Sequence, residues 1–200
     1  MTARSRIRTL VVTAALPWLA AVPPLGAQDT TAAAPRWEVL VSSGRFVPAG
    51  ALRESLDAGD HTGAQIAYVA RPGLALNATL GWTRTHDLAS ADAARLSVVM
   101  LDVGAELRTA RWLRADGVTV SPFAGAGVGA RRFVGNTVEA GARYNPAAYV
   151  GAGGEIGTRR VRVRLEAREY LSSFRALDGR GAPGAGNDLV VMAGLRMVRR

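Results

Sequence analysis

Apolar and polar side chains alternate residue by residue along most of this chain, and this period of two restricts the fold more than any other sequence feature. Residues 74–85 show the pattern most clearly. Every second position there is apolar: Leu74, Leu76, Ala78, Leu80 and Trp82. A strand sorts such residues onto one face, whereas a helix scatters them around its circumference. The pattern therefore predicts a β-strand with one apolar face.

Seven further stretches alternate in the same way, so we predict eight strands. They are expected at residues 37–44, 62–71, 74–85, 96–108, 118–131, 148–157, 160–170 and 188–198. The first, third, fifth and seventh links between them are long, about 10 to 17 residues. Pro72-Gly73 and Thr158-Arg159 are tight turns by contrast. This alternation places the long loops on one side of an up-and-down antiparallel sheet, as in transmembrane β-barrels with long external loops and short periplasmic turns.

Composition excludes several classes of protein. The chain is 48% hydrophobic, which excludes a disordered protein. It has no Cys and only two His, so disulfide scaffolds, thiol catalysis and Cys-ligated metals are excluded, and a multi-His metal site has few ligands. All 25 basic residues are Arg, and the formal net charge is +9. Because the Arg residues alternate along strands and form no basic stripe with aromatics, we expect no nucleic-acid binding.

The first 27 residues have the order of a secretory signal peptide. Three arginines begin the segment, an apolar run follows over residues 9–22, and small residues end it at Ala27. The run is shorter than the roughly 20 residues that a spanning helix needs. We therefore predict a cleaved signal peptide over residues 1–27, a short linker over 28–35 and one domain over 36–200. Cleavage lowers the formal charge to +6, since the removed segment holds three Arg and no acidic residue.

The direction of the two strand faces separates a membrane barrel from a soluble one. A soluble barrel points its apolar face inward, whereas a membrane barrel points it at lipid and keeps a polar interior. The apolar face here is nearly free of Phe, and the polar faces carry charges of opposite sign. We therefore predict an all-β, eight-stranded antiparallel transmembrane barrel whose lumen is plugged by a charge network. The predicted members are Glu38, Asp102, Glu106, Glu155, Arg162, Arg164, Glu166, Arg168 and Arg196.

One strand carries a family resemblance. Residues 122–129, with the sequence PFAGAGVG, resemble the P-[FY]-x-G-x-G-x-G strand common in small bacterial outer-membrane β-barrels of the OmpA-transmembrane-domain and OmpX-like class. The resemblance extends over roughly residues 36–200. It implies a monomeric, non-enzymatic protein of the outer membrane of a double-membraned bacterium. Its implied partners are outer-membrane lipids and, during biogenesis, the barrel-assembly machinery and periplasmic chaperones.

Arginines gather at the predicted short-turn end of the barrel. They are Arg36, Arg71, Arg108, Arg111, Arg114, Arg159, Arg160, Arg199 and Arg200. We expect this rim to contact anionic phospholipid headgroups, each contact contributing about 1 kcal/mol. The expected membrane-interface anchors are Trp37, Trp112, Arg111, Arg114 and Arg159.

The predicted long loops offer surfaces for contact with other molecules. They span residues 45–61, 132–147 and 171–187, and the segment 49–56 within the first is expected to form a short helical turn. We therefore predict a role in envelope structure or in surface interaction.

We predict no catalytic, cofactor-binding or metal-binding residues. His61 and His86 fall in expected external loops, and His86 beside Asp87 in sequence does not by itself supply an oriented base. The Gly run at 125–129 lacks the spacing and the helix of a dinucleotide fingerprint. Two alternatives stay open: a soluble periplasmic barrel that binds an apolar ligand, as lipocalins do, and a lipid-modifying barrel enzyme.

Overall fold

Each long strand pairs antiparallel with its neighbours around the barrel, and the first long strand pairs with the last. The computed structural model describes residues 36–50, 52–88, 93–109, 113–115, 117–135, 144–174 and 184–199. All of them belong to the second of two units, Ala33–Arg200. The predicted signal peptide and the linker at 28–35 lie outside the described residues.

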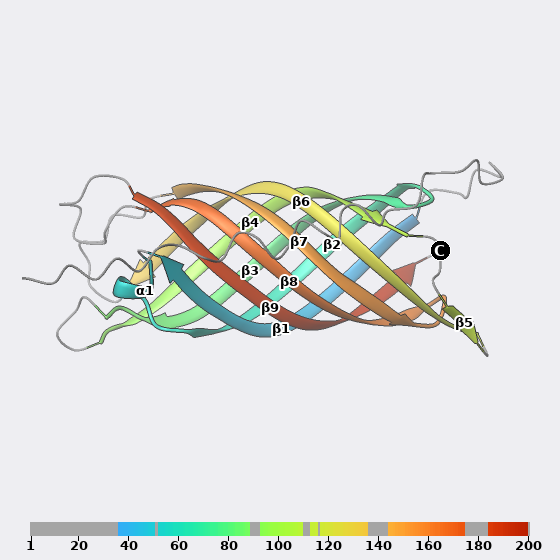
Figure 1. The fold of residues 1–200 in the computed structure, drawn as a ribbon, viewed down its shortest axis with the longest axis horizontal. Helices are drawn as coiled ribbons and strands as arrows, with labels where there is room; N and C mark the ends of the chain where they lie inside the picture. The colour runs from blue at the N-terminus through green and yellow to red at the C-terminus, as the bar shows by residue number, and fades with distance from the viewer. Residues whose placement is uncertain are drawn as a thin grey trace, which may run out of the picture. The chain divides into compact units, whose positions relative to one another are not determined.

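Eight long strands form the barrel wall within the described residues (Figure 1). In chain order they are β1 (Arg36–Gly50), β2 (Gly59–Arg71), β3 (Leu74–His86), β4 (Arg95–Arg108), β6 (Val118–Gly135), β7 (Tyr144–Gly157), β8 (Val161–Phe174) and β9 (Gly184–Arg199). Each pairs with the next, and β1 pairs with β9, so the sheet closes. Among the described strands, the short strand β5 (Leu113–Ala115) pairs only with β6. Closure removes open sheet edges, and the predicted eight-stranded antiparallel barrel is confirmed.

The loops of the predicted long-loop end are shorter than expected. The expected loops 45–61, 132–147 and 171–187 are wrong at both ends, because the links run over 51–58, 136–143 and 175–183. The apolar alternation stops before the backbone pairing does. At the pair Arg45–Asp60 the outward face is already charged, yet β1 continues to pair with β9 as far as Gly50. Backbone hydrogen bonds form whatever the polarity of the side chains, so hydrophobicity alone underestimates strand length.

The first of these links contains the helix α1 (Leu52–Ser55), which confirms the predicted helical turn. Leu52 and, directly after the helix, Leu56 are almost completely buried. The described residues include no helix long and apolar enough to cross a membrane.

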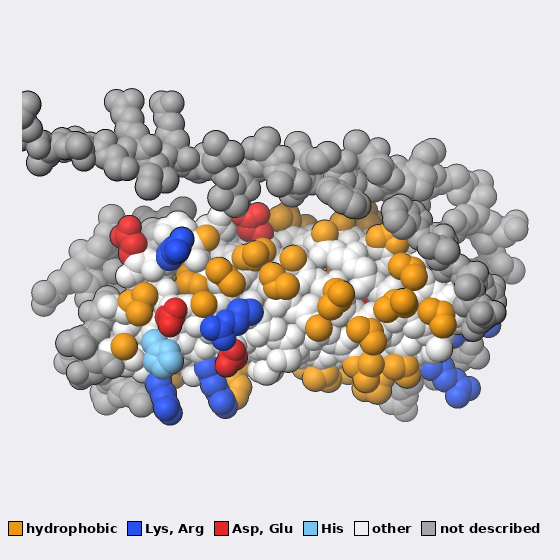
Figure 2. All heavy atoms as spheres, turned by 60° about the horizontal axis from the view of Figure 1, so that its bottom comes forward, with side chains coloured by type: hydrophobic (Ala, Val, Ile, Leu, Met, Phe, Trp, Pro, Cys, Tyr) orange, Lys and Arg blue, Asp and Glu red, His pale blue; other side chains and the backbone are white. Residues whose placement is uncertain are grey.

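Side chains of opposite character point to the two sides of the barrel wall. Inside, Glu38, Glu155 and Arg196 are at most 2% exposed. Outside, Val128 is 60% exposed and Leu165 63%. Figure 2 shows hydrophobic side chains over much of one outer face and charged side chains gathered mainly toward one end. The polarity of this barrel is therefore inverted relative to a soluble protein.

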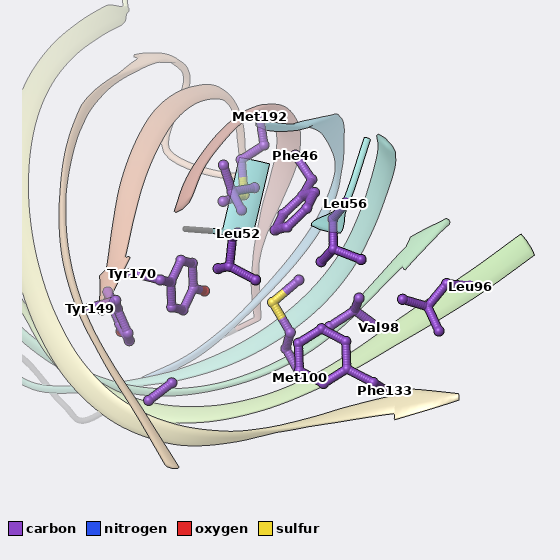
Figure 3. Close-up of a cluster of buried hydrophobic side chains, with 12 residues drawn as sticks. Phe46, Leu52, Leu56, Leu96, Val98, Met100, Phe133, Tyr149, Tyr170 and Met192 are labelled. Carbon is purple, nitrogen blue, oxygen red and sulfur yellow. The ribbon is translucent and has the colours of Figure 1, made fainter. Parts of the chain in front are cut away.

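The lumen has two zones along its length. At the end with the tight turns, charged side chains fill it. At the α1 end, an apolar cluster fills it, shown in Figure 3: Phe46, Leu52, Leu56, Leu96, Val98, Met100, Phe133, Ala147, Tyr149, Tyr170, Val190 and Met192. Leu52 and Leu56 thus help close the mouth of the barrel from within.

Candidate functional site in the barrel lumen

Arg164 occupies the centre of the charged zone. It extends from β8, and its guanidinium lies 2.6 Å from Glu106 of β4, 2.8 Å from Glu155 of β7 and 2.9 Å from Glu166. Its side chain is 1% exposed. The guanidinium carbon also lies 3.4 Å from the centre of the Phe123 ring. This one side chain thus spans the lumen and connects opposite parts of the wall.

Two more arginines extend the network around the barrel. Arg196 of β9 lies 2.9 Å from both Glu38 of β1 and Glu155. Arg108 of β4 lies 2.6 Å from Glu38 and 2.5 Å from Glu106. Glu38, Glu106 and Glu155 therefore each contact three arginines among the described residues, since Arg36 also reaches Glu38 and Arg162 reaches Glu155.

Strand geometry explains why these charges meet. Residues two apart on a strand point to the same side of the sheet, so Arg162, Arg164, Glu166 and Arg168 all enter the lumen from β8. Glu155 lies directly across from Arg164 on β7. Opposite charges at such a position stabilise the pair of strands.

Glycines on the inner face of β6 and β7 make room for these large side chains. A Cβ atom on Gly153 would lie 2.5 Å from the Phe123 ring, and one on Gly127 would lie 2.5 Å from the Tyr149 ring. One on Gly151 would lie 3.0 Å from Arg168. The glycine run that carries the family resemblance thus has a structural role, because it leaves space in the narrow lumen for large side chains from other strands.

A second polar layer separates the ion-pair network from the apolar cluster. Arg168 lies 2.6 Å from Glu166 and 4.0 Å from Asp102, and the Tyr170 hydroxyl donates a hydrogen bond of 2.8 Å to Asp102. Arg131 pairs with Asp188 through its two terminal guanidinium nitrogens, and its guanidinium lies over the Tyr170 ring. Both members of that pair are buried.

All nine side chains predicted for the lumen lie inside the barrel wall. Eight of them are at most 5% exposed, and the Arg162 side chain is 15% exposed at the end of the network. Asp102 contacts the others only through Arg168, at 4.0 Å. The structure thus brings the set together from five strands.

Three predicted positions are wrong, and one of them is His86: expected in an external loop, it is the last residue of β3 and faces outward. Arg108 does not lie on the rim: its side chain is 9% exposed and turns into the lumen between two glutamates. His61 does not lie in an external loop: it belongs to β2, is buried, and its Nδ1 lies 3.0 Å from the Thr83 hydroxyl. For these two inward-facing residues, counting by twos along the strand, from Glu106 or from Gln65, would have indicated the inward direction.

Of the predicted interface anchors, the structure describes the side chains of Trp37 and Arg159. Trp37 is 51% exposed near the start of β1 and packs against Tyr68, with 5.1 Å between ring centres. Arg159 is exposed in the link between β7 and β8. Arg111 and Trp112 lie outside the described residues, and Arg114 is described only as backbone within β5.

A closed antiparallel barrel with an apolar exterior and ion pairs inside has the architecture of a small transmembrane β-barrel. Solved structures agree with this class. The chain is similar to Neisserial surface protein A, with a TM-score of 0.61 and 13% identity over 80% of this chain and 96% of that one. It is also similar to the N-terminal β-barrel domain of OprF from Pseudomonas aeruginosa, with a TM-score of 0.50 and 15% identity over 81% of this chain and 97% of that one.

At these identities the likeness shows the fold alone, which is that of small outer-membrane β-barrels. No model of a protein family and no curated protein matches the chain.

Proposed function

We propose that this protein is a non-enzymatic β-barrel of the outer membrane that contributes to envelope structure or surface contact while its lumen stays closed. The inverted polarity of the wall carries the proposal. Large apolar side chains such as Leu76, Leu80 and Val150 are more than half exposed on the outside. Water would not favour such a surface, whereas acyl chains would. The signal peptide over residues 1–27 supplies the export that this location requires.

The contents of the lumen support a plug rather than a pore. The ion pairs around Arg164 and Arg196 join the wall on several sides, and the apolar cluster with Leu52 and Leu56 fills the other zone. A solute would have to separate buried ion pairs, and breaking a buried ion pair costs about 3–5 kcal/mol. The links at the α1 end then remain as the surfaces for contact.

The proposed partners follow from this location. They are outer-membrane lipids around a monomeric barrel, with the assembly machinery and periplasmic chaperones acting during biogenesis. At the short-turn end we propose Trp37, Arg159 and the predicted anchors Arg111, Trp112 and Arg114 as interface contacts. Changing Arg111, Arg114 and Arg159 together to Gln should lower resistance to extraction, and unchanged extraction would contradict this role.

The two alternatives have less support. A lipocalin-like soluble barrel requires an apolar lumen and a polar exterior, the reverse of the distribution around Glu106 and Val128. A lipid-modifying enzyme requires an oriented reactive group that reaches lipid: His61 lies inside the lumen beside Thr83, and His86, although exposed, lies across from Arg95 and not from a carboxylate.

Fractionation with detergent extraction tests the location, and planar-bilayer recording tests the plug. The proposal predicts that the protein is found with outer membranes, requires detergent, and migrates differently on gels before and after heating. It also predicts no resolvable conductance steps. A stable, detergent-free monomer would contradict the membrane location, and steady channel openings would contradict the closed lumen.

A further inference from the structure

The outer wall carries a group of charged side chains at the α1 end that takes no part in the lumenal network. Arg45, Asp60 and Arg84 point outward from β1, β2 and β3 and lie side by side in register. His86 and Arg95 follow as a cross-strand pair on β3 and β4. We call these five residues the outer arginine patch; charged side chains gather at this end in Figure 2.

The outer arginine patch carries an excess of positive charge. It has three arginines and one carboxylate, Asp60, which lies 2.6 Å from Arg45. Both members of that pair are well exposed, so the pair is weak and exchangeable. Arg84 and Arg95 have no ion pair among the residues that the structure describes, and the acidic residues Glu54, Asp57 and Asp87 belong to the links beyond the strand ends.

On β3 the apolar outer surface ends directly at this patch. On β3 the outward side chains of Leu76, Leu80 and Trp82 are 51%, 55% and 43% exposed, and Arg84 comes next on the same face. Arg84 lies two positions after Trp82, a rise of about 7 Å along the strand. The Arg84 guanidinium lies 4.3 Å from the centre of the Trp82 ring, which holds it along the wall. Tryptophan beside a cation is typical of the boundary between lipid and water.

We propose that the outer arginine patch binds the phosphate groups of an acylated, phosphorylated lipid in the leaflet at the α1 end of the barrel. Such a lipid places its acyl chains against Leu80 and Trp82. Its phosphates then lie further toward the α1 end, at Arg84 and Arg95. Arginine suits this task because its planar guanidinium donates two parallel hydrogen bonds to a phosphate. This inference rests on the proposed membrane location.

Titration of the folded, detergent-solubilised protein tests the proposal. The probes are bisphosphorylated lipid A, the same lipid with its phosphates removed, and inorganic phosphate, with bound molecules counted by native mass spectrometry. We expect the phosphorylated lipid to bind most tightly. Changing Arg84 and Arg95 together to Gln should weaken it at least tenfold, while Asp60→Asn should strengthen it, because Arg45 is released for the ligand.

A matched control removes a positive charge at the same end of the barrel but outside the outer arginine patch. Changing Arg53 of α1 to Gln should leave binding of the phosphorylated lipid within twofold of the wild type, whereas Arg84→Gln alone should weaken it. Equal loss in these two single variants would overturn the proposal, because binding would then follow overall charge. Equal affinity for the dephosphorylated lipid, or inorganic phosphate that binds as tightly as the lipid, would also overturn it.

If the proposed membrane location itself is wrong, the protein should be stable and monomeric without detergent, whatever its affinity for lipid. Heat-modifiable migration of each variant shows that the barrel is folded, so a loss of binding is not a loss of structure.

Discussion

Replacing Arg164 with Met isolates the contribution of the ion-pair network to stability. The change removes the guanidinium that Glu106, Glu155 and Glu166 share, and an unbranched side chain keeps the packing over Phe123. Breaking a buried ion pair costs about 3–5 kcal/mol when a charge is left without a partner. Each of the three carboxylates retains another arginine. We therefore expect a loss at the lower end, about 3 kcal/mol in the free energy of unfolding.

Equilibrium unfolding in urea, in lipid vesicles and followed by tryptophan fluorescence, measures this loss. Arg159→Met serves as the control, because Arg159 is exposed in a turn and its replacement should change stability by no more than about 0.5 kcal/mol. A loss of that same small size for Arg164→Met would refute the reasoning.

A double-mutant cycle tests the pairing itself. Glu106→Gln should cost less in the Arg164→Met background than in the wild type, by roughly 0.5–3 kcal/mol, because it removes a carboxylate that has lost one cation. Additive effects would show that the two side chains act independently.

Three further changes test other parts of the structure, each by the same unfolding assay. Gly153→Ala should destabilise by about 1–3 kcal/mol because its Cβ would clash with the backbone oxygen of Leu165, while Gly154→Ala, with nothing within 4 Å, should have little effect; similar losses would contradict the packing argument. Leu52→Ala should cost about 2–5 kcal/mol because the side chain is fully buried in the apolar cluster, whereas a negligible loss would mean that α1 does not close the mouth. Val128→Arg on the outer face should cost about 2–4 kcal/mol in a bilayer, and a neutral result would argue against lipid contact there.

The fold follows closely from local patterns. Leu74 to Trp82 alternate so regularly that strand, face and approximate length are all predictable, since a strand has only two faces on which to place side chains. The strand ends were less predictable. Around Ser43 and Arg45 the outward residues are polar while Phe46 faces the lumen, so the hydrophobic alternation breaks although the backbone pairing continues.

The lumen was only partly predictable. Arg164 and Glu155 were expected inside because they alternate with apolar residues, and the structure places them there. The sequence misplaces Arg108 and His61 because each lies near the end of an expected strand, where the alternation no longer shows which way a side chain points. The apolar cluster around Leu52 was not predicted, because it combines a link with side chains from strands far apart in sequence.

The sequence by itself determined eight alternating strands and the sorting of charged from apolar faces, because both depend on the period of a single strand. The tertiary structure alone decided which charges meet. Arg196 reaches Glu38, 158 residues away in the chain, only because closure of the barrel brings β9 beside β1. Ion pairs across a lumen depend on the register and closure of all the strands together, and no local pattern records either.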